Sequence, residues 1–257
     1  MTPAYFLEQV FQARPAWRSK SVDVQRLVVA WSNLVFRLSC GPFDRVLLRI
    51  YGSGSGMFDR AEEVQRARYI ADRGFGPKVL LNFEEGRVEE WLEGRTPSHQ
   101  EMRVEAMPQI ARTLRRFHER TGFNHHDLHH NNMLIMQDGD LQFLDFEYAG
   151  TLDPACDIAI HFNMWTGPQS KTGPYRYEPG LYPTLFQRRT FCEHYLGGSK
   201  GKGTVVDDFL QEIEKRRHHV DAWWGEWAEH SHSEFSDKYL AELKDQFEEW
   251  SCSKIGS

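Results

Sequence analysis

The feature that most constrains the fold is a pair of short apolar runs in the middle of the chain, residues 133–136 and 141–146. The turn between them contains Asp138-Gly139, and an Asp-Gly pair between apolar runs is a strong signal for a tight β-hairpin. Asn132 directly precedes the first strand of this hairpin, and Asp145 lies near the end of the second. The sequence therefore predicts that Asn132 and Asp145 lie close together in space.

The first third of the chain has the pattern of a β-sheet accompanied by two helices. Runs rich in β-branched and aromatic residues predict strands at 24–29, 34–39, 45–51, 78–83 and 86–91. Apolar residues at helical spacing predict a short helix at 5–12 and a second helix over 59–72. Gly74 and Gly76 would end the second helix.

The rest of the chain is predicted to be mostly helical around the hairpin. A helical region begins near Pro97. One helical face is apolar at Met107, Ile110, Ala111, Leu114 and Phe117. We therefore predict an α+β fold with two lobes, a β-rich lobe over 1–92 and a helical lobe over 93–257. A ligand cleft is expected between them.

Composition and charge exclude several classes of protein. The 257 residues carry a formal net charge of −6, whereas an extended nucleic-acid footprint needs a basic domain. No apolar run reaches the roughly 18 residues of a transmembrane helix, and the N-terminus lacks the pattern of a secretory signal. The four cysteines are scattered without a CxxC pair, which is typical of a reducing compartment. We expect a cytoplasmic protein with no nucleic-acid partner and no membrane span.

The chemistry is concentrated in the pattern His125-x-Asp127-x4-Asn132, followed by the hairpin and Asp145. Phosphoryl transfer needs an Asp that accepts the proton of an attacking hydroxyl, an Asn that binds a magnesium ion, and a second Asp that binds Mg²⁺ at the ATP phosphates. Hard oxygen ligands of this kind are those that Mg²⁺ prefers. Turn and capping roles would explain each residue singly, but not their order with a hairpin between them.

The first lobe supplies two further residues that phosphoryl transfer would need. A basic residue on the third strand and a Glu on the next helix would form an ion pair that faces the phosphates. Arg49 and Glu63 occupy these two positions. We therefore predict that Glu63 pairs with Arg49.

These motifs resemble those of choline/ethanolamine kinases. The resemblance rests on NHHDLHHNNMLI, FLDFEYAG and DIAIHFNMW, and upstream on VLLRIYG, DRAEEV, GPKVL and VEEWLEG. It runs from about residue 26 to about residue 240, and FEYAG with the DIxxHF segment is its most specific part.

The resemblance implies a kinase-like bilobal fold, ATP and Mg²⁺ as cofactors, and transfer of the γ-phosphate to the hydroxyl of choline or ethanolamine. It implies that Asp127 is the base, that Asn132 and Asp145 hold the metal, and that His125 braces the loop. The residues implied in nucleotide binding are Arg49, Glu63, Ser32, Asn33 and the hinge Glu90-Trp91-Leu92. The family resemblance also allows a homodimer.

The segment Trp224-Gly225-Glu226-Trp227 resembles the family's WGxW segment. An aromatic box recognises a quaternary ammonium because each ring face attracts the cation. The candidate substrate residues are Asp127, Glu147, Tyr148, Trp224, Trp227 and Tyr239. Spacing alone would favour a helix core for the two Trp residues, which lie three apart. The choice between choline and ethanolamine stays open.

Three departures from the family pattern stand out. The nucleotide loop reads Val29-Ala30-Trp31 where the family is Gly-rich. Only six residues separate His118 from His125, where the family has a long, largely helical insert. Met164 stands where the family tends to carry an acid.

Three alternative functions stay open. An aminoglycoside or other sugar kinase would need an acidic pocket. A pseudokinase-like module would bind its ligand without turnover. A metallohydrolase would use the histidines around Asp127, namely His126, His129 and His130.

Overall fold

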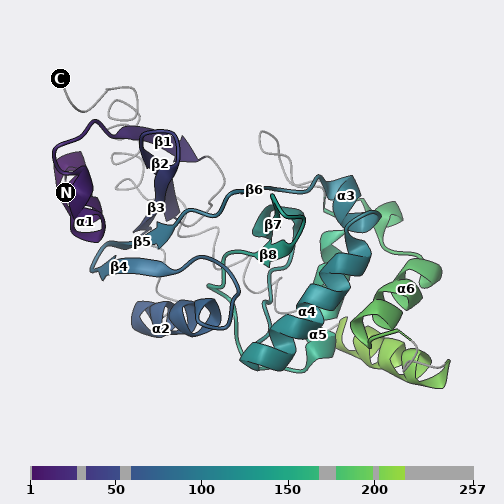
Figure 1. Ribbon diagram of the computed structural model, residues 1–257. Helices are drawn as coiled ribbons and strands as arrows, with labels where there is room; N and C mark the ends of the chain where they lie inside the picture. The colour runs from purple at the N-terminus through teal and green to yellow at the C-terminus, as the bar shows by residue number, and fades with distance from the viewer. Residues whose placement is uncertain (1, 28–32, 53–58, 168–177, 199–202, 218–257) are drawn as a thin grey trace. The chain divides into compact units, whose positions relative to one another are not determined.

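The computed structural model describes residues 2–27, 33–52, 59–167, 178–198 and 203–217 (Figure 1). These residues form two compact units. The first holds the described residues up to Asp72 together with Pro77–Leu92, and the second holds Arg73–Gly76 and the described residues from Glu93 on.

The first unit is an antiparallel sheet with two helices. Its elements are α1 (Pro3–Ala13), β1 (Asp23–Leu27), β2 (Asn33–Cys40), β3 (Asp44–Tyr51), α2 (Arg60–Ala71), β4 (Val79–Phe83) and β5 (Gly86–Glu90). The five strands are ordered β1-β2-β3-β5-β4. Each predicted strand and helix of this part of the chain is confirmed, with described ends shifted by one or two residues; the end of the first predicted strand, at 28–29, lies outside the described residues.

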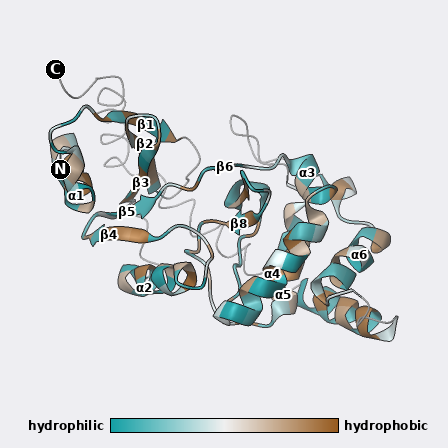
Figure 2. Ribbon diagram, in the orientation of Figure 1, coloured by the Kyte–Doolittle hydropathy of each residue, from teal (hydrophilic) through white to brown (hydrophobic). Residues whose placement is uncertain are grey.

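The core of this unit lies between α1 and the sheet. Phe6 and Val10 of α1 are fully buried and share a cluster with inward-facing strand residues such as Phe36 and Leu48. At the start of α2, the Asp59 side chain accepts hydrogen bonds from the next backbone amides, a standard helix N-cap. In Figure 2 the hydrophobic colour is strong on β4, which contacts both α1 and α2.

The second unit contains the predicted hairpin and the helices around it. Its elements are β6 (Gly94–Arg95), α3 (His99–Arg103), α4 (Met107–Thr121), β7 (Met133–Met136), β8 (Leu141–Phe143), α5 (Pro154–Met164) and α6 (Leu185–Tyr195). Residues 204–217 are also helical. The hairpin β7–β8 is confirmed, and the short strand β6, which the sequence did not predict, pairs with β7.

The second strand of the hairpin is shorter than predicted. It ends at Phe143, because the next residue, Leu144, donates its amide to the carbonyl of Asn132 outside the ladder. Asp145 then adopts the left-handed conformation with φ of 62°, which a strand cannot contain.

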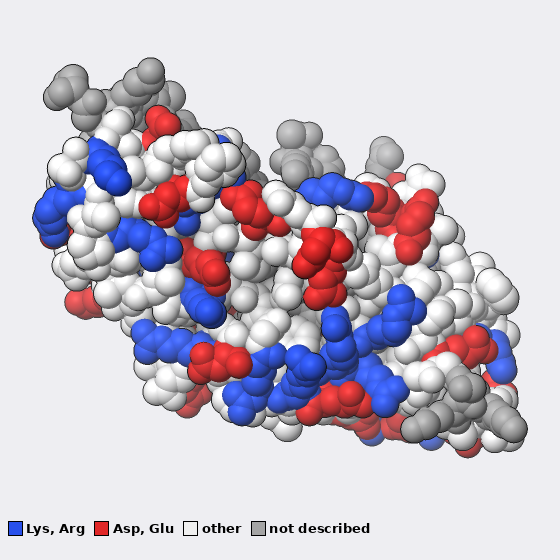
Figure 3. Space-filling view, in the orientation of Figure 1, with Lys and Arg blue, Asp and Glu red and all other residues white. Residues whose placement is uncertain are grey.

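The apolar face of α4 is confirmed as core. The five predicted residues of this face are all buried, and α4 packs against α6. Hydrophobic and hydrophilic residues alternate along α4 in Figure 2, and basic side chains gather over its outer face in Figure 3. In the described part of the chain, no helix is long and apolar enough to cross a membrane.

Candidate active site

Asp127 and Asn132 are joined directly. The Asn132 side-chain amide donates to both the backbone carbonyl and Oδ2 of Asp127, each at 2.9 Å. Asn132 lies in the short helical turn His130–Asn132 and is buried. The two residues therefore form one rigid unit, in which Asn132 fixes the orientation of the Asp127 carboxylate.

Asp145 is tied to the same unit through Leu144. The Leu144 amide donates to the Asn132 carbonyl at 2.9 Å, and Nε2 of His125 donates to the Leu144 carbonyl at 2.8 Å. Asp145 itself has a positive φ, which is uncommon for a residue other than Gly and is a recurrent feature of functional sites. The predicted proximity of Asn132 and Asp145 along the hairpin is thus supported by the backbone that connects them.

His125 braces the loop from the core side. It is fully buried, and its ring lies near the rings of Phe117, Phe143 and Phe146. Burial lowers its pKa, so the ring is neutral at pH 7. Since Nε2 donates to Leu144, Nδ1 is left to accept the backbone amide of Asp127 at 3.3 Å. This geometry fits the bracing role that the family resemblance implies.

The loop that carries Asp127 is anchored by a residue to which the sequence analysis gave no role, Asp157 of α5. Its carboxylate accepts the backbone amides of His125 at 2.7 Å and His126 at 2.8 Å. Asp157 is fully buried, in a helix that is otherwise largely apolar. A single acid inside an apolar helical run was the available sequence signal, because a buried carboxylate needs hydrogen-bond donors.

Asp157 also connects the loop to α4 and α6. Nε2 of His118 lies 2.9 Å from Oδ2 of Asp157, and Nδ1 of His118 lies 2.8 Å from the Tyr195 hydroxyl. Burial alone would raise the pKa of Asp157, but the hydrogen bond from His118 and the nearby imidazoles hold it well below its usual range. The carboxylate is therefore charged at any pH at which the protein would work.

Two more histidines of the loop have defined surroundings. Nε2 of His129 lies 3.5 Å from Oδ2 of Asp127. Burial would lower the pKa of His129, but the negative charges of Asp127 and Asp145 outweigh it and the pKa is raised. His126 has a φ of 64°, and its Nδ1 donates to the Tyr148 carbonyl at 2.9 Å.

The donor set of the site suits a magnesium ion. Asn132 uses its amide nitrogen on Asp127, so that Oδ1 is the atom with which it would bind a cation, and Asp145 adds a carboxylate. Oxygen ligands of this type, completed by substrate phosphates, are usual for Mg²⁺. Among the residues that the structure describes, no group of three His, Cys, Asp or Glu side chains is placed to hold a metal.

On the nucleotide side, Asn33 and the predicted hinge belong to the first unit. Asn33 is the buried first residue of β2. Glu90 ends β5 and donates its amide to the Lys78 carbonyl at 2.9 Å. Trp91 and Leu92 follow, partly exposed, and the Arg37 guanidinium lies 5.6 Å from the centre of the Trp91 ring.

The predicted ion pair between Arg49 and Glu63 is replaced by a different arrangement. Oε1 of Glu63 pairs with Arg87 at 2.6 Å, and Oε2 pairs with Arg60 at 2.5 Å. Arg49 instead lies 3.9 Å from Glu89. The prediction was wrong because Arg87 lies directly opposite Arg49 on the neighbouring strand and reaches α2 in its place.

The predicted substrate residues are only partly described. Glu147 is buried, and Tyr148 is partly buried next to His126. The remaining predicted positions, Ser32, Trp224, Trp227 and Tyr239, lie outside the described residues.

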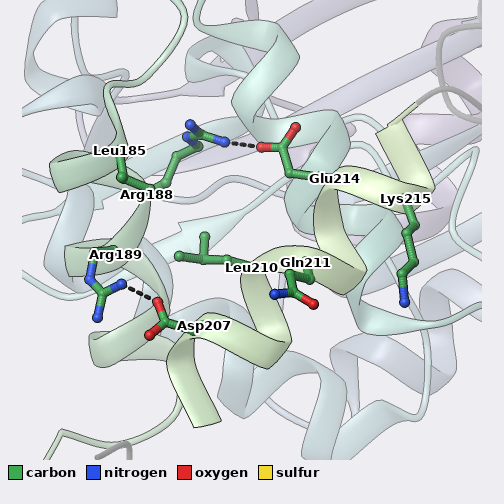
Figure 4. A pocket seen from close by; sticks show the side chains of 8 residues that line it. All are labelled: Leu185, Arg188, Arg189, Asp207, Leu210, Gln211, Glu214 and Lys215. Atoms are coloured by element: carbon green, nitrogen blue, oxygen red, sulfur yellow. Dashed lines mark hydrogen bonds and ion pairs between the residues drawn. The ribbon is translucent and has the colours of Figure 1, made fainter. Parts of the chain in front are cut away.

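An open groove of about 690 Å³ lies between α6 and residues 204–217 (Figure 4). Ion pairs Arg188–Glu214 and Arg189–Asp207 cross it. None of the predicted site residues lines this groove.

A hydrogen-bonded Asp and Asn on a loop, followed by a hairpin and a second Asp, match the residue order that kinase-like phosphotransferases use. Solved structures share the whole fold. A choline kinase from Cryptosporidium parvum superposes with a TM-score of 0.74 at 17% identity, over 96% of this chain and 97% of that one. A Plasmodium vivax ethanolamine kinase superposes with a TM-score of 0.72 at 16% identity, over 97% of this chain and 89% of that one. The predicted kinase-like α+β fold is thereby confirmed.

The family model described as choline/ethanolamine kinase matches residues 24–121 and 115–250. The chain belongs to the choline/ethanolamine kinase family, and it is an enzyme of the phosphotransferase type, as predicted. The two matched segments meet at the end of α4, where the sequence analysis placed the missing insert.

Curated relatives agree with this assignment. "Probable choline kinase 2" of Arabidopsis thaliana is 26% identical over 92% of this chain and 87% of its own length. The "choline/ethanolamine kinase" of Rattus norvegicus is 26% identical over 83% of this chain and 76% of its own length. "Ethanolamine kinase 1" of Mus musculus is 24% identical over 84% of this chain and 78% of its own length.

Proposed function

We propose that this protein is an ATP- and Mg²⁺-dependent kinase that transfers the γ-phosphate of ATP to the hydroxyl of choline or ethanolamine. The observation that carries the proposal is the double hydrogen bond from Asn132 to Asp127, with the loop held by Asp157. Catalysis of phosphoryl transfer depends on positioning and charge stabilisation, and a rigid loop supplies the first of these.

In this mechanism Asp127 orients the alcohol and takes its proton. The alcohol oxygen forms a bond to the γ-phosphorus while the bond from that phosphorus to the bridging oxygen of ADP breaks. The proton passes to the Asp127 carboxylate, whose Oδ2 is already fixed by Asn132. Nε2 of His129 lies 3.5 Å from the same Oδ2 and offers this carboxylate a second polar neighbour.

The cofactor roles follow from the family resemblance. Asn132 and Asp145 would hold magnesium, which neutralises charge on the phosphates. Arg49, Ser32 and Asn33 would face the phosphates, and the backbone of the hinge 90–92 would meet the adenine.

The substrate side supports an amino alcohol. Glu147 is buried close in sequence to Asp145, and a carboxylate there would attract a positive ammonium group. Tyr148, Trp224, Trp227 and Tyr239 would supply the aromatic faces that favour a quaternary ammonium. We propose that the soluble substrate is choline or ethanolamine and leave the choice to the assay.

The test is ADP release by the purified protein with ATP and Mg²⁺, with choline and ethanolamine supplied separately. Asp127→Asn should lower kcat by about 100-fold or more, since a general base contributes about 10²–10⁴. Asp138→Asn, in the exposed turn of the same hairpin, is the matched control and should leave kcat unchanged.

Each outcome of this assay distinguishes between the possible functions. Turnover with one amino alcohol, lost in Asp127→Asn alone, supports the proposal and selects the substrate. Mg²⁺-dependent ATP binding without turnover on either amino alcohol would indicate another alcohol or a binding module. Absence of both turnover and ATP binding would refute the proposal.

A further inference from the structure

The strongest feature that the proposed function uses only in part is a cluster of charged side chains between the sheet of the first unit and α2. It consists of three arginines and two glutamates, which we call the buried charge cluster: Arg49, Arg60, Glu63, Arg87 and Glu89. Four of these residues are at least nine-tenths buried, and only Arg60 is partly exposed. Buried charges at this density are costly unless each is paired.

Arg87 is the centre of the cluster. Its NH1 group lies 2.6 Å from Oε1 of Glu63 on α2, and its Nε lies 2.5 Å from Oε1 of Glu89 on the same strand. One guanidinium therefore ties the helix to the sheet. Burial alone would lower the pKa of Arg87, but the two carboxylates outweigh it and raise it, so the charge is permanent.

The strand register explains why Glu89 is needed. Arg49 and Arg87 are direct partners across β3 and β5, so the two side chains leave the sheet on the same face. Like charges directly opposite one another repel. Glu89 lies two residues along β5 on that face, and its Oε1 is 2.5 Å from Arg87 and 3.9 Å from Arg49. The Glu89 carboxylate therefore lies near both arginines and offsets part of their repulsion.

We propose that Arg87 and Glu89 are positioning residues of the nucleotide site, which hold the Arg49 guanidinium in the place from which it contacts the phosphates. This inference rests on the proposed function, which assigns Arg49 to the phosphates. It replaces the predicted pair of Arg49 and Glu63 with two separate roles. Glu63 holds α2 to the sheet through Arg87, and Glu89 orients Arg49.

The test compares Glu89→Gln and Arg87→Lys with the wild type. Gln keeps an oxygen acceptor but removes the charge between the two arginines. Lys keeps the charge of Arg87 but lacks the rigid planar fork with which Arg87 pairs with Glu63 and Glu89. Both variants should raise KM for MgATP by about tenfold, the effect of losing one well-placed contact. KM for the amino alcohol should stay unchanged.

The direction of the change in KM for MgATP distinguishes a positioning role of Glu89 from a purely electrostatic one. If Glu89 acted only as a negative charge near the phosphates, its removal would lower KM for MgATP. If the cluster were only structural, the variants would melt earlier while KM for MgATP stayed at the wild-type value. Either result would overturn the inference.

Arg18→Lys is the matched control, because Arg18 forms an exposed two-point pair with Glu8 in the same unit. It should leave both KM values unchanged. If the wild type binds MgATP without turnover, the Kd measured by calorimetry replaces KM. A wild type that turns over normally, with unchanged KM in Glu89→Gln and Arg87→Lys, refutes this inference alone. A wild type that neither binds nor consumes ATP refutes it together with the proposed function.

Discussion

Replacement of Asp157 by Asn should damage both the stability and the activity of the protein. Asn has nearly the same shape, but it presents one oxygen and one NH₂ group. Oδ1 of Asp157 accepts the amide of His126, and Oδ2 accepts the amide of His125 and faces His118. Whichever way the Asn side chain is turned, its NH₂ group meets a buried donor.

The magnitude follows from these contacts. Hydrogen bonds to a charged group contribute about 1.5–3 kcal/mol each, and Asp157→Asn would lose at least one of those made by the two backbone amides and weaken the other. We therefore expect Asp157→Asn to lower the free energy of unfolding by roughly 3–5 kcal/mol, out of the about 5–15 kcal/mol typical of a domain. Because the lost contacts hold the loop of Asp127, kcat should fall as well.

Urea denaturation followed by circular dichroism measures the first effect, and ADP release below the transition measures the second. Asp153→Asn at the start of the same helix is the matched control, since Asp153 caps α5 from a partly exposed position and Asn is an equally good cap. A loss below about 1 kcal/mol with normal kcat in Asp157→Asn would show that the carboxylate does not anchor the loop.

Two further predictions concern the same unit. Burial lowers the pKa of His161 to about 4, and the neutral ring donates from Nδ1 to the Leu128 carbonyl and accepts Trp165 Nε1–H at Nε2. The unfolded chain takes up a proton on this ring near pH 6.5, and the folded chain only near pH 4. The free energy of unfolding should therefore fall by roughly 3 kcal/mol as the pH drops through this window. Urea titrations at pH 7 and 4.5 should show a smaller fall in His161→Gln than in the wild type, and an equal fall would contradict the assignment. Gly76→Ala should destabilise the folded protein by about 1–3 kcal/mol more than Gly74→Ala. Both glycines have positive φ, but only at Gly76 would the new methyl group clash with the Phe146 ring. Equal melting temperatures in the two variants would refute the packing at Gly76.

Much of the fold could be predicted because its signals are local. Strand alternation, the Asp138-Gly139 turn and the apolar face of α4 depend on neighbouring residues, and each of these elements is found in the structure. The link between Asn132 and the residue before Asp145 follows from the hairpin itself, so the order of residues was enough to predict it.

The partners of buried charges could not be predicted in this way. Glu63 pairs with Arg87, which is 24 residues away, because strand register sets Arg87 opposite Arg49 and within reach of α2. The anchoring of the loop by Asp157 spans 32 residues and depends on where α5 packs. No local pattern encodes such distances.

The sequence by itself determined the class of fold and the family, because hydrophobic periodicity and motif order are properties of the chain. The tertiary structure decided which arginine pairs with Glu63, that Glu89 lies near both Arg49 and Arg87, and that Asp157 holds the loop of Asp127. The physical reason is that a buried charge takes whichever opposite charge packing brings within hydrogen-bond distance, and only the packed chain defines that distance.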